Sequence, residues 1–165
     1  MTARHRYLVA LGSNVRHPRH GLPRRVIEAA MGVLAERFAL AARSAIVDTA
    51  PLGPSNRRYA NAAALVETAL APGDMLAALQ VIERGFGRRR RGRRWGARVL
   101  DLDLVLWSGG SHFAPGLAIP HPAFRERAFV LAPAAAIAPG WRDPATGLTV
   151  RQTHARLTRP RRLHR

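Results

Sequence analysis

The chain is predicted to have an α+β fold of the split βαβ type, in which two helices pack on one face of an antiparallel sheet. Two segments, 24–40 and 72–86, carry apolar residues at helical spacing, and strand-like runs flank both of them. The 165 residues are 47% hydrophobic, which is enough for one domain with a hydrophobic core. We therefore expect a single domain over 1–165, with a basic, partly frayed tail over about 151–165.

The first half of the chain is expected to form a strand, a helix and two further strands. Gly12-Ser13-Asn14 is typical of a turn after the first strand, and Pro23 suits the first position of a helix. Prolines and glycines between residues 49 and 54 prevent the second strand from extending far. These elements are expected at 7–11 (strand), 24–40 (helix), 43–48 (strand) and 59–70 (strand).

The second half is expected to form a helix, a strand and a further helix. Asp74 is assigned to the N-cap of the helix, and Gly85 and Gly87 to its end. Pro133 is expected to kink or interrupt the last helix. The apolar face of the 72–86 helix is assigned to Met75, Leu76, Leu79, Val81, Ile82 and Phe86. The later elements are expected at 100–107 (strand), 117–122 (short extended segment) and 124–137 (helix).

Two aspartates on the predicted strand 100–107 form the most informative motif. Asp101 and Asp103 alternate with leucines at 100, 102, 104 and 106, so both carboxylates point to one face and the leucines to the other. Residues i and i+2 of a strand lie roughly 6.5–7 Å apart, and two carboxylates so close repel each other unless a cation lies near them. The pair alone fits either a divalent metal site or a solvated strand face.

An arginine-rich segment comes directly before this strand. It contains arginines at 88–91, 93, 94 and 98, interrupted by Trp95-Gly96. By itself such a run fits a solvated loop or a nucleic-acid-binding patch. Beside an aspartate pair it also suits a magnesium polyphosphate, because the carboxylates hold the metal and the guanidinium groups hold the phosphates.

The composition narrows the class of protein. The absence of cysteine excludes disulfides and thiolate metal sites. No apolar run approaches the roughly 20 residues that span a bilayer, so we expect a cytoplasmic protein without a membrane partner. The formal charge is +17 and the chain has no lysine, so arginine supplies this excess, which favours polyanions in general at low salt.

Several short segments together resemble one family, the 6-hydroxymethyl-7,8-dihydropterin pyrophosphokinases. They occur in the family's order, from about residue 7 to 140, and the segment Arg-Trp-Gly-x-Arg-x-Leu-Asp-Leu-Asp is the most specific of them. The matching segments are Leu11 to Asn14, Thr49 to Gly53, Tyr59 to Asn61, Arg94 to Leu104, Ile119 to Pro122 and Arg127 to Pro133.

The resemblance implies both a fold and an activity. The fold would be the ferredoxin-like split βαβ, in agreement with the element order above. The reaction would transfer pyrophosphate from ATP to the hydroxymethyl group of 6-hydroxymethyl-7,8-dihydropterin, leaving AMP, in folate biosynthesis. Two Mg²⁺ ions would act with ATP as co-substrate. The expected partners are these small molecules and no specific nucleic acid, and we expect a monomer.

The resemblance also implies roles for individual residues. Asp101 and Asp103 would bind the magnesium ions, while Tyr59 and Phe129 would sandwich the pterin ring. The implied catalytic residues are Arg88, Arg98, Asp101 and Asp103. The implied ATP-binding residues are Glu83, Arg90, Arg94, Arg98, His121 and Arg127. The implied pterin-binding residues are Thr49, Leu52, Tyr59, Asn61, Trp95 and Phe129, with Thr49 and Leu52 acting through their backbones.

Two other classes of function compete with this interpretation. A basic ferredoxin-like nucleic-acid-binding module would account for the charge and the arginine segment, but such modules usually display aromatic residues in the middle of the sheet, and here Asp101 and Asp103 would repel phosphate. A metal-dependent phosphohydrolase could use the same aspartates. It would need a water-activating base and more carboxylates than the sequence offers at this point.

Overall fold

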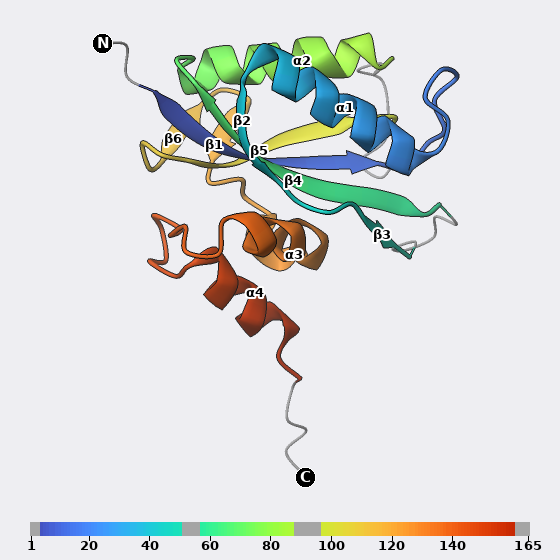
Figure 1. Ribbon diagram of the computed structural model, residues 1–165. Helices are drawn as coiled ribbons and strands as arrows, with labels where there is room; N and C mark the ends of the chain where they lie inside the picture. The colour runs from blue at the N-terminus through green and yellow to red at the C-terminus, as the bar shows by residue number, and fades with distance from the viewer. Residues whose placement is uncertain (1–3, 51–56, 88–96, 161–165) are drawn as a thin grey trace.

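The protein is built on a five-stranded antiparallel sheet (Figure 1). The computed structural model describes residues 4–50, 57–87 and 97–160. The strands follow the order β2-β4-β1-β5, and β3 also pairs with β4, which confirms the predicted split βαβ topology. The strands of this sheet are β1 (His5–Ser13), β2 (Ala39–Arg43), β3 (Val47–Thr49), β4 (Tyr59–Thr68) and β5 (Asp101–Trp107).

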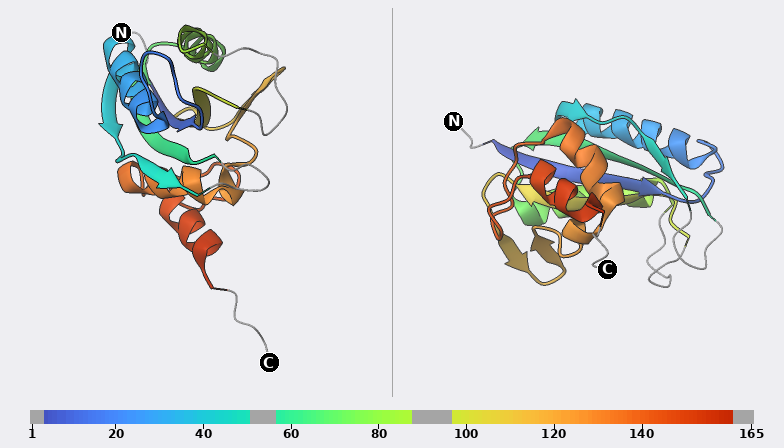
Figure 2. Two further views of the ribbon diagram at one scale, coloured as in Figure 1. Left: turned by 90° about the vertical axis from the view of Figure 1, so that its right-hand side faces the viewer. Right: turned by 90° about the horizontal axis from the view of Figure 1, so that it is seen from below.

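Helices cover both faces of the sheet (Figure 2). On one face, α1 (Pro23–Arg37) and α2 (Pro72–Gly85) pack against alternate residues of β1, β4 and β5 in a large hydrophobic cluster. On the other face, a 3₁₀ helix (Phe124–Glu126) and α3 (Ala128–Ile137) pack on a smaller cluster that includes Leu8 and Ala63. Because successive side chains of a strand point to opposite faces of the sheet, alternate residues pack against each of the two layers of helices.

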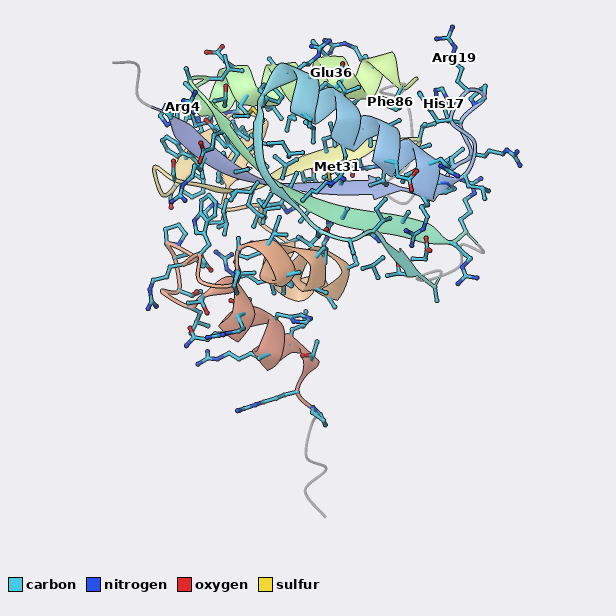
Figure 3. The ribbon with its side chains drawn as sticks, in the orientation of Figure 1. Arg4, His17, Arg19, Met31, Glu36 and Phe86 are labelled. Carbon is cyan, nitrogen blue, oxygen red and sulfur yellow. The ribbon has the colours of Figure 1, made fainter. Side chains whose placement is uncertain are left out.

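The two helices on the larger face are amphipathic, as predicted. Met31 lies between α1 and the sheet, whereas Glu36 is exposed on the same helix (Figure 3). The predicted end of the first helix at Leu40 was wrong, because Phe38 is already extended and Ala39 begins β2. In α2 the N-cap is Ala71, not the predicted Asp74, which instead lies in the first turn.

The predicted apolar face of α2 was wrong at one position. Val81 is 42% exposed, while Met75, Leu79 and Ile82 of the same helix are buried. Met75, Leu79 and Ile82 recur at the helical period and define the buried face. Val81 lies about 100° from Ile82 on the side away from Leu79, outside that face. The leucine pattern of β5 also has one exception: a register shift in the β1–β5 pairing moves Leu106 to the smaller cluster.

Two regions contain strands that differ from the prediction. The expected strand at 43–48 is divided between β2 and β3, each of which pairs with its own part of β4. Residues 108–116, to which no strand was assigned from the sequence, contain β6 (His112–Ala114), which pairs with β7 (Leu117–Ile119) in a separate hairpin. These short pairings depend on partners distant in sequence or on turn geometry, so local apolar patterns carry little signal for them.

The C-terminal part differs most from the prediction. The helix expected at 124–137 is interrupted at Arg127, which has an extended conformation, and Pro133 lies buried within α3. Residues expected in a frayed tail instead form α4 (Val150–Thr158). Thr149 and Gln152 form a capping box at its start, which satisfies backbone donors that would otherwise lack partners.

In the part of the chain that the structure describes, no helix is long and apolar enough to cross a membrane.

Candidate active site

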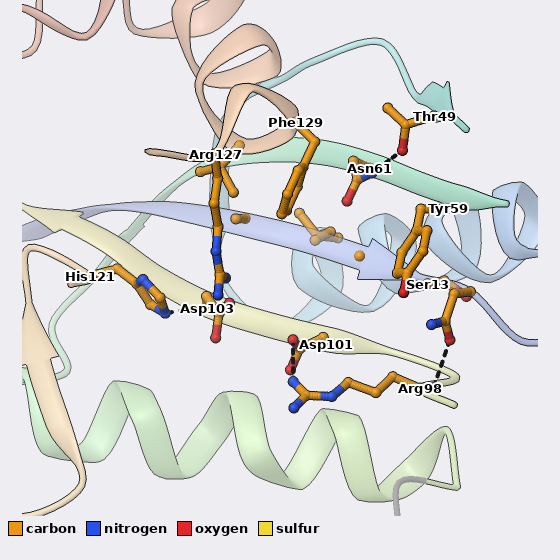
Figure 4. A pocket seen from close by; sticks show the side chains of 15 residues that line it. Ser13, Thr49, Tyr59, Asn61, Arg98, Asp101, Asp103, His121, Arg127 and Phe129 are labelled. Carbon is orange, nitrogen blue, oxygen red and sulfur yellow. Dashed lines mark hydrogen bonds and ion pairs between the residues drawn. The ribbon is translucent and has the colours of Figure 1, made fainter. Parts of the chain in front are cut away.

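A cavity of about 310 Å³ lies where the ends of β1, β4 and β5 meet the first turn of α3 (Figure 4). This volume is at the lower end of the range for small-molecule sites. Polar, charged and aromatic side chains converge on it from strands, loops and α3. The described residues around the cavity are Ala10, Leu11, Gly12, Ser13, Asn14, Thr49, Tyr59, Asn61, Arg98, Asp101, Asp103, His121, Arg127, Phe129 and Val130.

The floor of the cavity is formed by small residues of β1. Gly12 lies opposite Asn61 of β4 in one pairing and opposite Asp101 of β5 in the other. A Cβ atom on Gly12 would lie 3.3 Å from Oδ1 of Asn61, tighter than an ordinary contact, so glycine leaves room for the amide. Asn61 is buried, and its Nδ2 donates a hydrogen bond of 3.2 Å to Oγ1 of Thr49.

Two aromatic side chains line the same cavity. Tyr59 is the first residue of β4 and Phe129 the second residue of α3. Figure 4 shows their rings on either side of the Asn61 side chain. The guanidinium carbon of Arg127 lies 5.8 Å from the centre of the Phe129 ring, within the range of a cation–π contact. Flat rings around a hydrogen-bonding amide suit a planar heterocycle.

The aspartate pair lies beside the aromatic part of the cavity, and basic side chains surround it. Nη1 of Arg98 donates to Oδ2 of Asp101 at 2.7 Å, and Nε2 of His121 lies 3.7 Å from Oδ2 of Asp103. Burial and the neighbouring Asp101 raise the pKa of Asp103, while His121, Arg127 and Arg98 act in the opposite direction. The charge on Asp103 is therefore costly and favours an additional cation.

The donor set fits magnesium held jointly with a polyphosphate. In the described part of the chain, no three histidine, aspartate or glutamate residues are grouped as a metal cage would require. Magnesium, however, usually binds through one or two carboxylates and completes its shell with phosphate oxygens and water. Asp101 and Asp103 supply this number of carboxylates on one strand face, and Arg98, His121 and Arg127 line the same cavity.

Most of the predicted site residues that the structure describes meet in this cavity. They are Thr49, Tyr59, Asn61, Arg98, Asp101, Asp103, His121, Arg127 and Phe129. Glu83 differs: it is 3% exposed on α2, does not line the cavity, and accepts a hydrogen bond from the backbone N–H of Leu102. Its role in binding ATP stays a prediction. The predictions for Leu52, Arg88, Arg90, Arg94 and Trp95 fall outside the described residues.

Sequence reasoning assigned no role to several residues that line the cavity, chiefly Asn14, Ser13, Ala10 and Val130. Asn14 had been interpreted only as part of a turn. Its side chain accepts a hydrogen bond from the backbone N–H of Arg98, 84 residues away. The available signal was an asparagine directly after a buried strand, since the end of such a strand is a common position for site residues in a sheet.

Comparison with known proteins gives the family. The family model described as 7,8-dihydro-6-hydroxymethylpterin-pyrophosphokinase (HPPK) matches residues 8–139. The chain belongs to the HPPK family. The match covers α1, α2, α3 and all of the sheet except the first three residues of β1, and therefore every described residue that lines the cavity. The sequence-based resemblance is thereby confirmed.

Curated HPPK relatives match over most of their length. The 2-amino-4-hydroxy-6-hydroxymethyldihydropteridine pyrophosphokinase of Pseudomonas aeruginosa is 43% identical over 143 residues, which are 84% of this chain and 84% of the relative. The enzyme of the same name from Bacillus subtilis is 34% identical over 152 residues, covering 90% and 87%. The enzyme from Synechocystis is 37% identical over 150 residues, covering 90% and 74%.

Solved HPPK structures share the fold. The crystal structure of wild-type Plasmodium falciparum HPPK-DHPS superposes with a TM-score of 0.68 at 12% identity. The superposition covers 94% of this chain and 45% of that longer chain. At this identity the likeness concerns the fold alone, and it agrees with the split βαβ sheet and its helices.

Proposed function

We propose that this protein transfers the pyrophosphoryl group of ATP to the hydroxymethyl oxygen of 6-hydroxymethyl-7,8-dihydropterin, which yields AMP and the pterin pyrophosphate in folate biosynthesis. Membership of the HPPK family gives the reaction class. One observation carries the assignment to a site: the aspartate pair and its cationic neighbours line the same cavity as Tyr59, Asn61 and Phe129. Groups suited to a polyphosphate thus adjoin groups suited to a flat heterocycle.

The aromatic part of the cavity would bind the pterin. Tyr59 and Phe129 would contact the two faces of the ring, worth roughly 0.5–1.5 kcal/mol for each good contact beyond burial of area. Asn61, held by Thr49, would form hydrogen bonds with the polar edge of the pterin. A site that pairs with these polar groups rejects analogues that lack them, because its own buried groups would then have no partner.

The charged part of the cavity would bind ATP. Arg98, His121 and Arg127 would neutralise phosphate oxygens, and Arg98 lies nearest to the aspartate pair. In the reaction, the hydroxymethyl oxygen forms a bond to the β-phosphorus while the bond from that phosphorus to the oxygen of AMP breaks, and the hydroxyl proton passes to solvent. Such a transfer depends on positioning and charge neutralisation more than on a covalent protein group.

We further propose that Asp101 and Asp103 hold two Mg²⁺ ions. Magnesium bound there would neutralise phosphate charge and lower the pKa of the attacking hydroxyl. The support is the donor set described above, in particular a partly buried carboxylate whose ionised form is disfavoured by burial and by its neighbour. The protein's part is to keep both carboxylates on one face of β5.

We also propose that the chain acts as one domain, as a monomer and in the cytoplasm. A single chain supplies the aspartates, the cationic side chains and the aromatic rings of the cavity. ATP and magnesium are both plentiful in the cytoplasm. The net charge of +17 predicts some salt-sensitive, non-specific binding to nucleic acids. The two carboxylates at the centre of the site do not favour a specific nucleic-acid partner.

The proposal is tested by following AMP release from ATP, Mg²⁺ and 6-hydroxymethyl-7,8-dihydropterin. AMP should form only when the pterin is present, and chelation of magnesium should stop it. Analysis of the products should show one pterin pyrophosphate for each AMP. Release of phosphate without a pyrophosphorylated pterin would instead indicate a phosphohydrolase and overturn the proposal.

A further inference from the structure

Two buried polar side chains hold the backbone at the start of β5, where the catalytic groups begin. Asn14, directly after β1, contacts the backbone of Arg98, and Glu83 of α2 contacts the backbone of Leu102. Their exposed fractions are 6% and 3%. We call Asn14 and Glu83 the β5 clamp. They approach the segment 98–102 from two elements that are distant from it in sequence.

Asn14 forms hydrogen bonds with both backbone polar groups of Arg98, the N–H and the carbonyl oxygen. Oδ1 of Asn14 accepts from the N–H of Arg98 at 2.7 Å, and the N–H of Asn14 donates to the carbonyl oxygen of Arg98 at 3.0 Å. The side chain thus acts like one more residue of strand pairing beyond the end of β1. From the backbone held in this way, the Arg98 guanidinium reaches Asp101.

Glu83 holds the residue between the two aspartates. Its Oε1 accepts from the N–H of Leu102 at 2.8 Å. β5 lies at an edge of the sheet, so an N–H that points away from β1 needs a partner outside the sheet. Because Asp101 and Asp103 flank Leu102, a shift of this amide would move both carboxylates relative to each other and to the cavity.

A purely structural interpretation would be that both side chains only satisfy buried backbone groups. The location of the contacts supports a further role. Both bonds fall within the five residues that carry Arg98 and Asp101, and one lies between the two aspartates. Partners that orient metal ligands without touching the metal typically affect metal affinity or activity by 10-fold to 100-fold.

We infer that Asn14 and Glu83 are positioning residues for the Mg²⁺–ATP complex: Asn14 fixes the backbone of residue 98 and so places the Arg98 side chain, and Glu83 fixes the backbone of Leu102 and so places Asp101 and Asp103. This assigns Glu83 a role through the backbone of β5 instead of direct contact with the nucleotide. The inference rests on the proposed function, because it concerns the same phosphate-binding side of the cavity.

The role of Glu83 is tested with Glu83→Met, which removes the acceptor at similar volume, and Glu83→Gln, which keeps an acceptor oxygen. Calorimetry measures binding of a non-hydrolysable ATP analogue at a series of Mg²⁺ concentrations, and separately binding of the pterin without Mg²⁺. We expect Glu83→Met to weaken Mg²⁺-dependent analogue binding by roughly 10-fold to 100-fold. Pterin affinity should stay the same, and Glu83→Gln should recover most of the loss.

Ile82→Ala is the matched control, because Ile82 is equally buried on the same helix. It should lower the melting temperature and leave the Mg²⁺ dependence unchanged. If Glu83→Met keeps the wild-type Mg²⁺ dependence, or if Ile82→Ala changes it equally, Glu83 has only a structural role and the inference is overturned for this residue.

The role of Asn14 is tested with a double-mutant cycle between Asn14→Ala and Arg98→Ala. If Asn14 acts by placing the Arg98 side chain, its substitution should lower turnover roughly 10-fold to 100-fold in the wild type and have little further effect once that side chain is absent. Equal losses in both backgrounds would overturn the inference for Asn14.

These experiments distinguish the clamp from the proposed function. If the wild type binds the Mg²⁺–nucleotide complex but forms no pterin pyrophosphate, the proposed function fails while the binding measurements still decide the role of Glu83. If the wild type shows no Mg²⁺-dependent nucleotide binding, the clamp has nothing to arrange and is overturned.

Discussion

Arg98 and Asp101 form a hydrogen-bonded ion pair of 2.7 Å at the rim of the cavity. The Arg98 guanidinium therefore lies beside a carboxylate that we assign to magnesium. We propose that it stabilises the negative charge that shifts between phosphate oxygens during the transfer. Arg98→Ala should lower turnover by roughly 10²-fold to 10³-fold, as for loss of one preorganised transition-state donor. Pterin affinity should change by less than about threefold.

Steady-state kinetics and pterin titration check this prediction. Arg37→Ala removes an equal charge from an exposed position at the end of α1 and should change neither quantity. A collapse of pterin affinity with unchanged turnover at saturation would show that Arg98 binds the pterin and not the transferring phosphates.

Asp103 should show opposite effects on activity and stability. Burial and Asp101 make its charge costly in the protein without metal, so Asp103→Asn should unfold at the same temperature or a higher one. The same variant should lose at least about 10²-fold in magnesium-dependent turnover. Thermal melts with and without Mg²⁺, together with the AMP assay, test both expectations; activity close to that of the wild type would remove Asp103 from the metal site.

Phe129 should contribute mainly to pterin binding. Phe129→Ala removes one face of the proposed ring sandwich, and the lost stacking alone corresponds to roughly 3-fold to 10-fold in the pterin dissociation constant. Phe113→Ala is a suitable control because that ring is 74% exposed on the β6–β7 hairpin. Fluorescence titration gives the two dissociation constants, and equal values for both variants would contradict the sandwich.

The Asp143–Arg125 pair should make stability sensitive to acid. Asp143 is 1% exposed and accepts bonds of 2.6 and 2.8 Å from the Arg125 guanidinium. Burial would raise the pKa of Asp143, but the hydrogen bonds from Arg125, Ala145 and Thr146 together lower it. A lowered carboxylate pKa stabilises the folded state above the ordinary aspartate value, and that contribution is lost as the pH falls through the folded value.

Asp143→Asn should therefore cost on the order of 3 kcal/mol near neutral pH and reduce the loss of stability below about pH 5. Urea unfolding at several pH values measures both effects. Asp48→Asn breaks an ion pair of 3.1 Å whose two side chains are 47% and 45% exposed, so it should cost less than about 1 kcal/mol. Equal costs for the two variants would refute a special role for the buried pair.

Much of the sheet and the site could be predicted from sequence because the signals are local. Leucines and aspartates alternate along β5, so the face of each side chain followed from strand geometry alone, up to the register shift near Leu106. The helix α1 also followed from its apolar spacing. The aspartate pair was therefore placed correctly on one face, while its convergence with Tyr59 and Phe129 needed the family resemblance.

The features that sequence reasoning missed depend on contacts between distant segments. Nothing near Asn14 indicates that its amide meets Arg98, and nothing near Glu83 indicates that its carboxylate meets the edge of β5. The end of α1 was misplaced because Phe38 and Leu40 continue an apolar spacing that the strand β2 uses instead. The arginines of α4 suggested a solvated tail. The helix nevertheless packs against the rest of the protein through two buried residues, Val150 and Thr153.

The burial of Val150 sets a practical limit on how this protein can be shortened or fused. The family match stops at residue 139, which suggests a natural place to cut, yet the cluster beneath α3 includes Val150 at 1% exposure. A chain cut at residue 139 would uncover Leu131 and Ala134 in the helix that also carries Phe129. Such a chain should lose pterin affinity without any change in the residues that we assign to the pterin, so a purification tag or fused partner belongs after residue 158.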